Sequence, residues 1–152
     1  MHARAALLTA LGAAGLACVD RGAAVHFGDL RIAHAAIPAP PAPDQASAFL
    51  VIDNGSATPV ALVEVRSPDA DSVRLHEMAH GRMHAVLRIE VPARGRLLLA
   101  PGGYHLMLGG LRRHLAVGDT VALDLRFEPG GTVTVRAPVR TYTDAVSGLP
   151  AR

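Results

Sequence analysis

"TVALDLRFEPGGTVTVRAPV", residues Thr120–Val139, has the clearest strand pattern in the chain. Apolar side chains occupy every second position on both sides of the Pro129-Gly130-Gly131 turn, at Val121, Leu123, Leu125 and Phe127 and again at Val133, Val135, Ala137 and Val139. Successive side chains of a β-strand point to opposite faces, so this alternation buries one face of each strand. The stretch therefore predicts a β-hairpin that covers a hydrophobic core.

Further short apolar runs precede this hairpin, and turn residues separate most of them. The runs are residues 48–53, 60–65, 72–80, 82–91, 97–99 and 104–108. The proline-rich segment 38–43 predicts a stiff, extended loop. Strands that recur about every eight to twelve residues, with no long helical periodicity, predict an all-β sandwich or barrel in one domain.

The composition fits a small domain and argues against nucleic-acid binding. The chain has 152 residues, is 50% apolar and only 3% aromatic, and has no tryptophan, so we expect a core of mostly valine, leucine and alanine. All 15 basic residues are arginines, and acidic residues scattered among them reduce the net charge to +2. A nucleic-acid-binding protein needs a clustered basic face and stacking aromatic side chains, which this sequence lacks.

The first residues predict an export signal. Arg4 precedes an apolar run over residues 5–16, which is too short to span a bilayer of about 30 Å but is typical of a signal-peptide core. We therefore expect a signal peptide over residues 1–24 and a mature domain over residues 25–152. This domain would lie outside the cytoplasm, in the periplasm or its equivalent.

Two ways of ending the leader remain open. Cleavage before Cys18, the only cysteine in the chain, would give a lipoprotein whose anchor is its sole attachment to the membrane. Ordinary cleavage would fall after Ala17 or after Ala24. In both cases the mature domain has at most one thiol and no disulfide.

A cluster of histidines and methionines between residues 76 and 107 is the most informative feature of the sequence. Three of the four methionines and four of the eight histidines lie there. The members are His76, Met78, His80, Met83, His84, His105 and Met107. Thioether sulfur is a soft ligand that suits Cu(I), and imidazole also binds copper, so the cluster predicts a copper site that needs no thiolate.

Strand geometry would bring members of this cluster together. Residues two apart on a strand share a face, which groups His76 with Met78 and His105 with Met107. Two such pairs on neighbouring strands could converge at one end of a sandwich.

The other histidines are expected to differ in their roles. His80 would join His76 and Met78 only if their strand continued that far. His84 would point away from the face of Met83, its neighbour in the chain. We expect the remaining histidines of the mature domain at the surface: His26, His34 and His114.

Two other metal sites can be weighed against this one. Residues 76–80 match the H-E-x-x-H pattern of zinc peptidases, in which both histidines bind zinc from one face of a helix. Here the helix would have to pass through Gly81, and residues 72–75 alternate as in a strand. A blue-copper site requires a cysteine ligand, and Cys18 lies in the leader. We therefore expect neither site, and no enzyme activity.

Three stretches resemble the PCu(A)C family of periplasmic copper chaperones. They are residues 48–68 (AFLVIDNGSATPVALVEVRSP), residues 73–78 (VRLHEM) and residues 99–139, in which PGGYHLML is the most specific part. The resemblance covers most of the chain after the leader. It implies a cupredoxin-like β-sandwich, of the immunoglobulin-like Greek-key type, that binds Cu(I) through histidine and methionine.

The ligand motif of that family is a histidine, ten residues, a methionine, twenty-one residues and then His-x-Met. Residues 84–104 separate Met83 from His105, which matches the second half of the motif. Only six residues separate His76 from Met83. A hairpin shortened by four residues near Gly81 explains this difference, because an even change preserves the face that each strand presents.

The resemblance thus implies a ligand set and a task. The Cu(I) ligands would be His76, Met83, His105 and Met107, with Met78 as the first substitute and His80 as a further alternative for the first position. The chain would be a monomer that delivers copper by ligand exchange toward cytochrome c oxidase, either to an oxidase subunit or to a Sco-type chaperone. An alternative of another class is an immunoglobulin-like structural or interaction module with a degenerate metal site.

Overall fold

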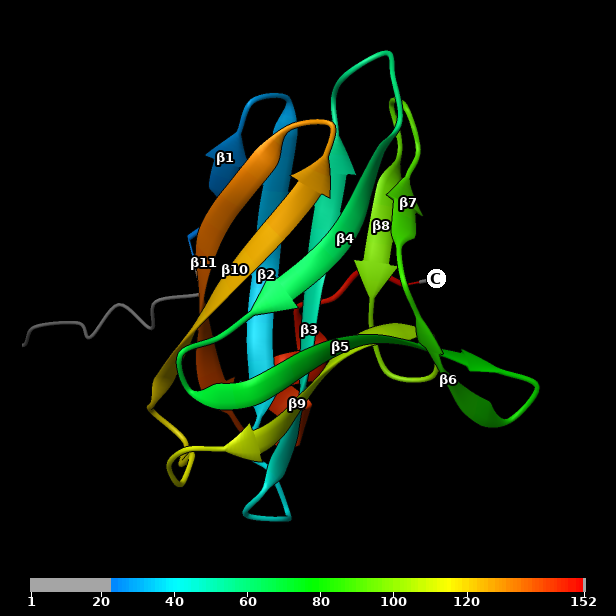
Figure 1. Cartoon of the computed structure of the whole chain (residues 1–152). Helices are drawn as coiled ribbons and strands as arrows, with labels where there is room; N and C mark the ends of the chain where they lie inside the picture. Colours follow the sequence, from blue (N-terminus) through cyan, green and yellow to red (C-terminus); the bar gives the residue numbers. More distant parts are fainter. Residues whose placement is uncertain (1–22, 152) are drawn as a thin grey trace, which may run out of the picture.

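A computed structural model describes residues 23–151 and consists almost entirely of strands (Figure 1). The elements are β1 (Val25–Phe27), β2 (Leu30–Pro38), β3 (Gln45–Asn54), β4 (Val60–Arg66), β5 (Ala70–Ala79), β6 (Arg82–Val86), β7 (Ile89–Val91), β8 (Arg96–Leu99), β9 (Tyr104–Leu111), β10 (Thr120–Glu128), β11 (Gly131–Arg140) and α1 (Tyr142–Ser147). The all-β prediction is confirmed. The expected leader lies outside the described residues apart from Ala23 and Ala24, and so does Cys18.

The strands form two layers that face each other, as in a β-sandwich (Figure 1). One layer has the order β6-β5-β9-β8-β3-β2, with β1 beside β2, and the other has the order β11-β10-β4-β7. The layers join where β2 and β11 run parallel for a short distance. β3 pairs with β9 along its first half and with β8 along its second half, so this one strand supports both.

The β10–β11 hairpin forms as its alternation predicts. Leu123 lies opposite Val135 and Leu125 lies opposite Val133. The inward side chains of β10 are almost completely buried, whereas Thr134 on the other face of β11 is exposed. The hairpin therefore has one face in the core and one toward solvent.

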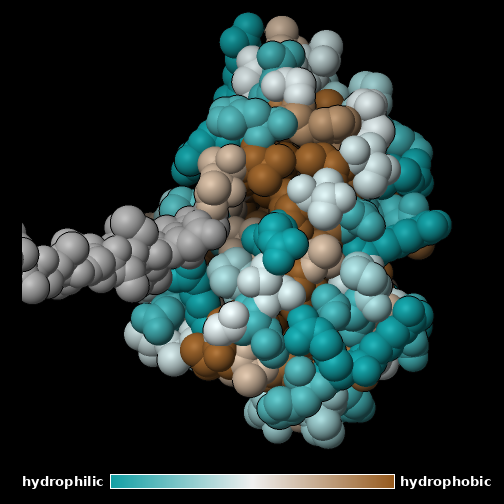
Figure 2. Space-filling view, turned by 90° about the vertical axis from the view of Figure 1, so that its left-hand side faces the viewer, coloured by the Kyte–Doolittle hydropathy of each residue, from teal (hydrophilic) through white to brown (hydrophobic). Residues whose placement is uncertain are grey.

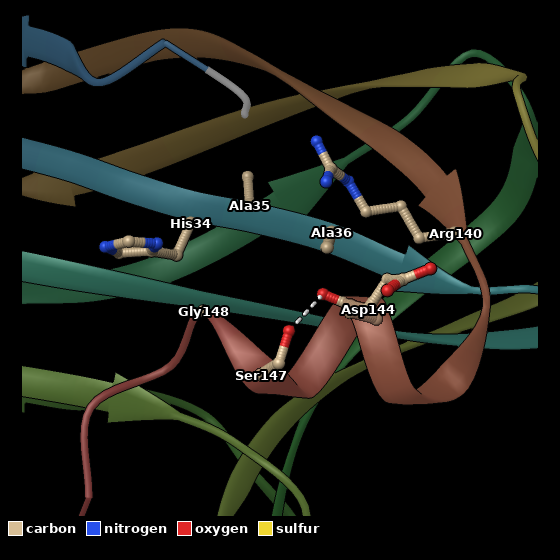
Figure 3. A pocket seen from close by; sticks show the side chains of 8 residues that line it. His34, Ala35, Ala36, Arg140, Asp144, Ser147 and Gly148 are labelled. Atoms are coloured by element: carbon tan, nitrogen blue, oxygen red, sulfur yellow. Dashed lines mark hydrogen bonds between the residues drawn. The ribbon is translucent and has the colours of Figure 1, made fainter. Parts of the chain in front are cut away.

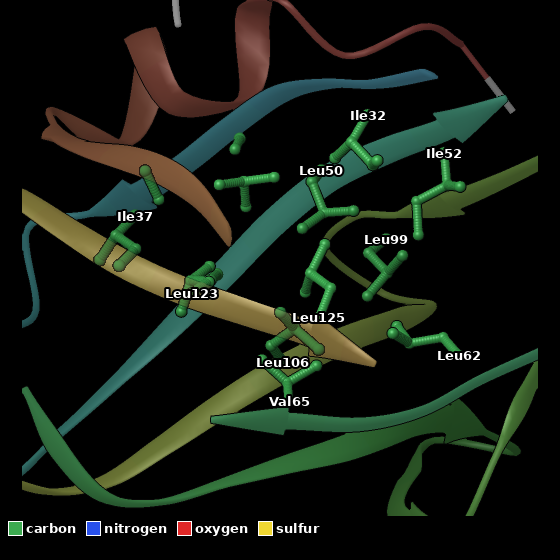
Figure 4. Close-up of a cluster of buried hydrophobic side chains, with 14 of the residues drawn as sticks. Ile32, Ile37, Leu50, Ile52, Leu62, Val65, Leu99, Leu106, Leu123 and Leu125 are labelled. Carbon is green, nitrogen blue, oxygen red and sulfur yellow. The ribbon is translucent and has the colours of Figure 1, made fainter. Parts of the chain in front are cut away.

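Aliphatic side chains from both layers fill the space between them (Figure 4). The first layer contributes Ile32, Ile37, Leu50, Ile52, Leu99 and Leu106, and the second contributes Leu62, Val65, Leu123 and Leu125. Phe127 is the largest fully buried side chain, and its ring centroid lies 6.5 Å from that of Phe27. The core therefore contains isoleucine in addition to the expected valine, leucine and alanine. Burial of each large aliphatic side chain contributes about 1.5–3 kcal/mol.

Two segments differ from the prediction. The run over residues 82–91 is not one strand: it divides into β6, which pairs with β5, and β7, which pairs with β4 in the opposite layer. Exposed Leu87 and Arg88 cross between the layers. The strand expected over residues 72–80 also ends one residue early, since β5 stops at Ala79 and His80 lies in the turn.

Hydrophilic and intermediate residues cover most of the face shown in Figure 2, and hydrophobic residues gather in its upper part, with a smaller spot lower down. This agrees with strands whose second face points to solvent. Among residues 23–151, no helix has the length and apolar character needed to cross a membrane.

Candidate metal centre

Antiparallel pairing places all five predicted ligands on one face of the strands β6, β5 and β9. His76 of β5 lies directly opposite His105 of β9, and Met78 of β5 lies directly opposite Met83 of β6. Directly opposed residues project to the same side, with Cβ atoms about 5 Å apart. Met107 follows His105 by two residues and so shares its face. We call His76, Met78, Met83, His105 and Met107 the soft-ligand face.

The two imidazole rings lie close enough to bind one ion. The ring centroids of His76 and His105 are 5.6 Å apart, and the ring planes meet at 85°. A metal–nitrogen bond of about 2 Å places the centroids of two imidazoles on a shared ion about 5–6 Å apart. The separation therefore fits a shared ion.

The backbone sets the tautomer of His105. Its Nδ1 lies 3.0 Å from the carbonyl oxygen of Gly103. A carbonyl oxygen can only accept, so Nδ1 carries the proton and donates it, and Nε2 keeps its lone pair. The same carbonyl accepts the backbone N–H of Met78 at 3.1 Å. Ligating histidines in metal sites are oriented in this way by their second nitrogen.

His76 contributes a buried nitrogen without a partner. Its Nδ1 makes no hydrogen bond with any of the described residues, and it is the only such buried side-chain atom among them. Burial, the neighbouring His105 and the guanidinium of Arg74 lower the pKa of His76 from its usual value. The ring is therefore neutral at physiological pH and offers a lone pair. An unpaired buried polar atom costs about 1–3 kcal/mol, which a bound ion would offset.

The soft-ligand face grades from buried to exposed. His105 is 7% exposed and Met83 is 51% exposed, with His76, Met78 and Met107 between them. Within residues 23–151, no three histidine, cysteine, aspartate or glutamate side chains lie close enough to hold a metal ion. An ion at this place would therefore need the thioethers as well as the imidazoles.

His80 does not belong to the soft-ligand face. His80 and Gly81 form the two-residue turn between β5 and β6, with φ of 51° and 73°. A type I′ hairpin turn requires positive φ at both positions, and glycine provides this without strain at the second. His80 is exposed in this turn, so its proposed role as an alternative ligand is not supported.

The zinc-peptidase pattern is not realised either. Its first four residues belong to β5, and the fifth, His80, lies in the turn, so no helix presents His76 and His80 on one face. His84 lies opposite Glu77, on the reverse face of the strands, as predicted. His26, His34 and His114 are exposed, as predicted.

Arg74 is a neighbour of the site that the sequence analysis missed. It lies opposite Met107 across β5 and β9, and therefore on the soft-ligand face. The alternation Arg74-x-His76-x-Met78 could have identified it, because these three residues share a face of one strand. Its guanidinium leaves the site with a positive neighbour.

A separate pocket of about 370 Å³ lies between α1 and the strands β2 and β11 (Figure 3). His34, Arg140 and Asp144 are among its lining residues, and the Ser147 hydroxyl donates a hydrogen bond to the backbone carbonyl of Asp144 at 3.3 Å. None of the five predicted ligands lines it. The soft-ligand face is thus a distinct site.

Comparison with known sequences agrees on one family. Residues 30–139 match the family described as "Putative lipoprotein LpqE-like". A curated relative, "Putative lipoprotein Lxx21020" of Leifsonia xyli subsp. xyli, is 37% identical over 100 residues. That match covers 62% of this chain and 60% of the relative.

Solved structures of copper-binding domains share the fold. The copper-bound PCuAC domain from PmoF2 superposes with a TM-score of 0.70 at 29% identity, over 78% of this chain and 98% of that domain. The solution structure of CuI-DR1885 from Deinococcus radiodurans gives 0.62 at 36% identity, over 71% of this chain and 76% of that one. The cupredoxin-like prediction is thereby confirmed, and the chain belongs to the LpqE-like family, with the fold of the PCuAC domains.

Proposed function

We propose that this protein is an extracytoplasmic Cu(I)-binding chaperone. Its cargo would be held by His76, Met83, His105 and Met107, with Met78 beside them as a substitute. The observation that supports this most is the convergence of all five side chains on one face, next to the unpaired Nδ1 of His76. The copper-bound structures of PmoF2 and DR1885 support the same cargo.

The donor set suits a soft monovalent ion. Two neutral imidazoles and the thioether sulfurs carry no negative charge, so they would stabilise Cu(I) better than Zn²⁺ or another divalent ion. His105 would bind through Nε2, because its Nδ1 donates to Gly103. His76 would bind through Nδ1 or Nε2, and only the first choice satisfies its buried unpaired atom.

Copper would leave by stepwise ligand exchange. Met83 is half exposed, so a donor atom of an acceptor protein can approach the ion from its side, whereas His105 is buried and would release the ion last. Each step replaces one neutral donor by another and needs no acid, base or nucleophile. The protein would therefore act without enzyme activity, as a carrier.

The proposal also covers the cellular location of the protein and the protein that receives its copper. The leader within residues 1–24 would direct export and be cut before Cys18, which would carry a lipid anchor, in keeping with the lipoprotein descriptions of the family and of the Leifsonia relative. Residues 25–152 would form the working domain. The monomeric protein would supply copper toward cytochrome c oxidase assembly, through an oxidase subunit or a Sco-type chaperone.

An anaerobic titration with Cu(I) against a chromophoric Cu(I) chelator tests the function. We expect one tightly bound Cu(I) per chain and weak binding of Zn²⁺ in a parallel titration. The double variant His105→Ala, Met107→Ala should lose more than about 100-fold in Cu(I) affinity, since loss of even a supporting group costs about 10–100-fold.

The control variant is His84→Ala, which removes an imidazole from the same strands but from the reverse face. Its Cu(I) affinity should equal that of the wild type. If the double variant keeps the wild-type affinity, His105 and Met107 are not the ligands. If the wild type cannot compete with the chelator, the protein is instead a structural module with a degenerate site.

A further inference from the structure

Six arginines in the described chain have acidic partners, and three on or next to the β5–β6 hairpin do not. Arg74 lies on the soft-ligand face, whereas Arg82 lies on the reverse face, opposite Ala79. The paired ones are Arg31, Arg66, Arg96, Arg112, Arg113 and Arg126. Arg74 on β5, Arg82 on β6 and Arg88 after β6 are exposed and form no ion pair with any of residues 23–151. The ion-pairing pattern therefore leaves uncompensated positive charge near the proposed copper site.

The acidic residues of these strands are engaged elsewhere. Asp71 pairs with Arg112 at 2.9 Å. Glu77 points to the reverse face, where burial and the nearby Glu77 carboxylate raise the pKa of Tyr104, the residue directly opposite. A Cu(I) ion on neutral ligands would add one more positive charge beside Arg74. Among the described residues of β5, β6 and β9, no acidic side chain lies on the soft-ligand face.

β6 also has the accessibility that a docking surface needs. It is an edge strand that pairs only with β5, and β6 projects from the sandwich together with the end of β5 (Figure 1). Leu87, directly after β6, is 92% exposed, and Met83 is 51% exposed. A partner that docked on this edge would bury both apolar side chains, which favours association.

We propose that β6 and its flanking residues Arg74, Arg82, Leu87 and Arg88 form the docking surface for an acidic copper-acceptor protein. The acceptor would present carboxylates around a soft metal-binding group. Opposite charges speed the encounter of two proteins by factors of about 10–1,000 and fix their orientation. The carboxylates would pair with the three guanidiniums and compensate the charge of the cargo while the ligands exchange. The inference rests on the proposed function, because it names the partner chemistry of that same site.

Two synthetic peptides test it: a short methionine-containing peptide flanked by glutamates, and the same peptide with glutamines. Fluorescence anisotropy with the copper-free protein measures docking, and stopped-flow absorbance with the Cu(I)-loaded protein measures transfer. We expect the glutamate peptide to bind and to accept copper at least about tenfold faster at low ionic strength. High salt should remove this advantage.

Variants locate the surface. The double variant Arg82→Glu, Arg88→Glu should abolish the preference for the glutamate peptide while its Cu(I) affinity stays unchanged. Arg136→Glu is the matched control, because Arg136 is exposed on β11 and likewise lacks an ion pair with the described residues. The salt dependence of the wild type tests the idea even if the double variant folds poorly.

Three results would overturn the proposal: equal behaviour of the two peptides, an equal loss in Arg136→Glu, or binding to phosphatidylglycerol vesicles through the same arginines without any peptide preference. The last result would assign the surface to a membrane. A protein that fails to bind Cu(I) refutes the proposed function instead, and the anisotropy experiment still reports on docking in that case.

Discussion

The β10–β11 hairpin and the β5–β6 hairpin have the same plan, two antiparallel strands and a short turn, but opposite surroundings. β10 lies between β4 and β11, and its inward side chains are almost completely buried. β6 has a neighbour on one side only, and none of its residues is fully buried. The molecule thus concentrates stability in one hairpin and places its chemically reactive side chains on another that solvent can reach.

Replacement of Phe127 by alanine should have the largest effect and should be confined to stability. Phe127 is 1% exposed in the core, so its loss should lower the free energy of unfolding by about 3–5 kcal/mol. Urea denaturation measures the change. Arg136→Ala, on the exposed side of the same hairpin, should change stability by less than about 0.5 kcal/mol. A loss below about 1 kcal/mol for Phe127→Ala would mean that the core does not depend on this hairpin.

Met83→Leu should instead weaken Cu(I) binding and leave stability nearly unchanged. Leucine has nearly the same volume, and the side chain is 51% exposed, so stability should change by less than about 0.5 kcal/mol. Loss of the sulfur should weaken Cu(I) binding by about tenfold, or about 1.4 kcal/mol. Competition with the chromophoric chelator measures this, with His84→Gln as control. Unchanged affinity would remove Met83 from the ligand set and leave Met78 in its place.

Gly81→Ala should have the smallest effect, but it should lower both the stability of the fold and the affinity for Cu(I). Gly81 has a φ of 73°, and a Cβ atom there would meet nothing within 4 Å, so the only cost is backbone strain of about 1 kcal/mol. Because this turn holds Met78 opposite Met83, Cu(I) affinity should fall slightly as well. Thermal unfolding and the Cu(I) titration measure the two effects.

Gly28→Ala is the matched control for Gly81→Ala. Gly28 also has a positive φ, 58°, with open space around it, but it lies in the turn between β1 and β2. It should lose similar stability and keep full Cu(I) affinity. If both variants lower the affinity equally, the turn of the β5–β6 hairpin has no specific role in the site.

The fold was predictable where the apolar residues of a strand follow one simple pattern, either alternating with polar residues or forming a continuous run. β10 and β11 alternate without interruption, and β3 and β4 are continuous apolar runs, so all four were identified. β2 was missed because a bulge at His34, with a φ of 55°, interrupts its pattern. β6 and β7 were merged, because the sequence does not show that exposed Leu87 and Arg88 carry the chain from one layer to the other.

The candidate site was predictable within each strand but not between strands. The alternation rule correctly grouped His76 with Met78 and His105 with Met107. The register that sets His76 opposite His105 depends on pairing between segments about thirty residues apart, which alternation alone does not define. The sequence did not decide whether His80 belongs to the strand or to the turn. His-Gly is a weaker signal for a type I′ turn than Asn-Gly, the usual one.

The carbonyl of Gly103 determines how the orientation of His105 can be kept during evolution and protein design. It sets the tautomer of His105 through the main chain, and it also accepts the N–H of Met78 in the neighbouring strand. Every residue type has a backbone carbonyl, so this hydrogen bond does not depend on the identity of a neighbouring side chain. The orientation that leaves Nε2 free therefore depends on the path of the backbone. An engineer who transplants this histidine into another sandwich should therefore move the loop that ends at Gly103 together with it.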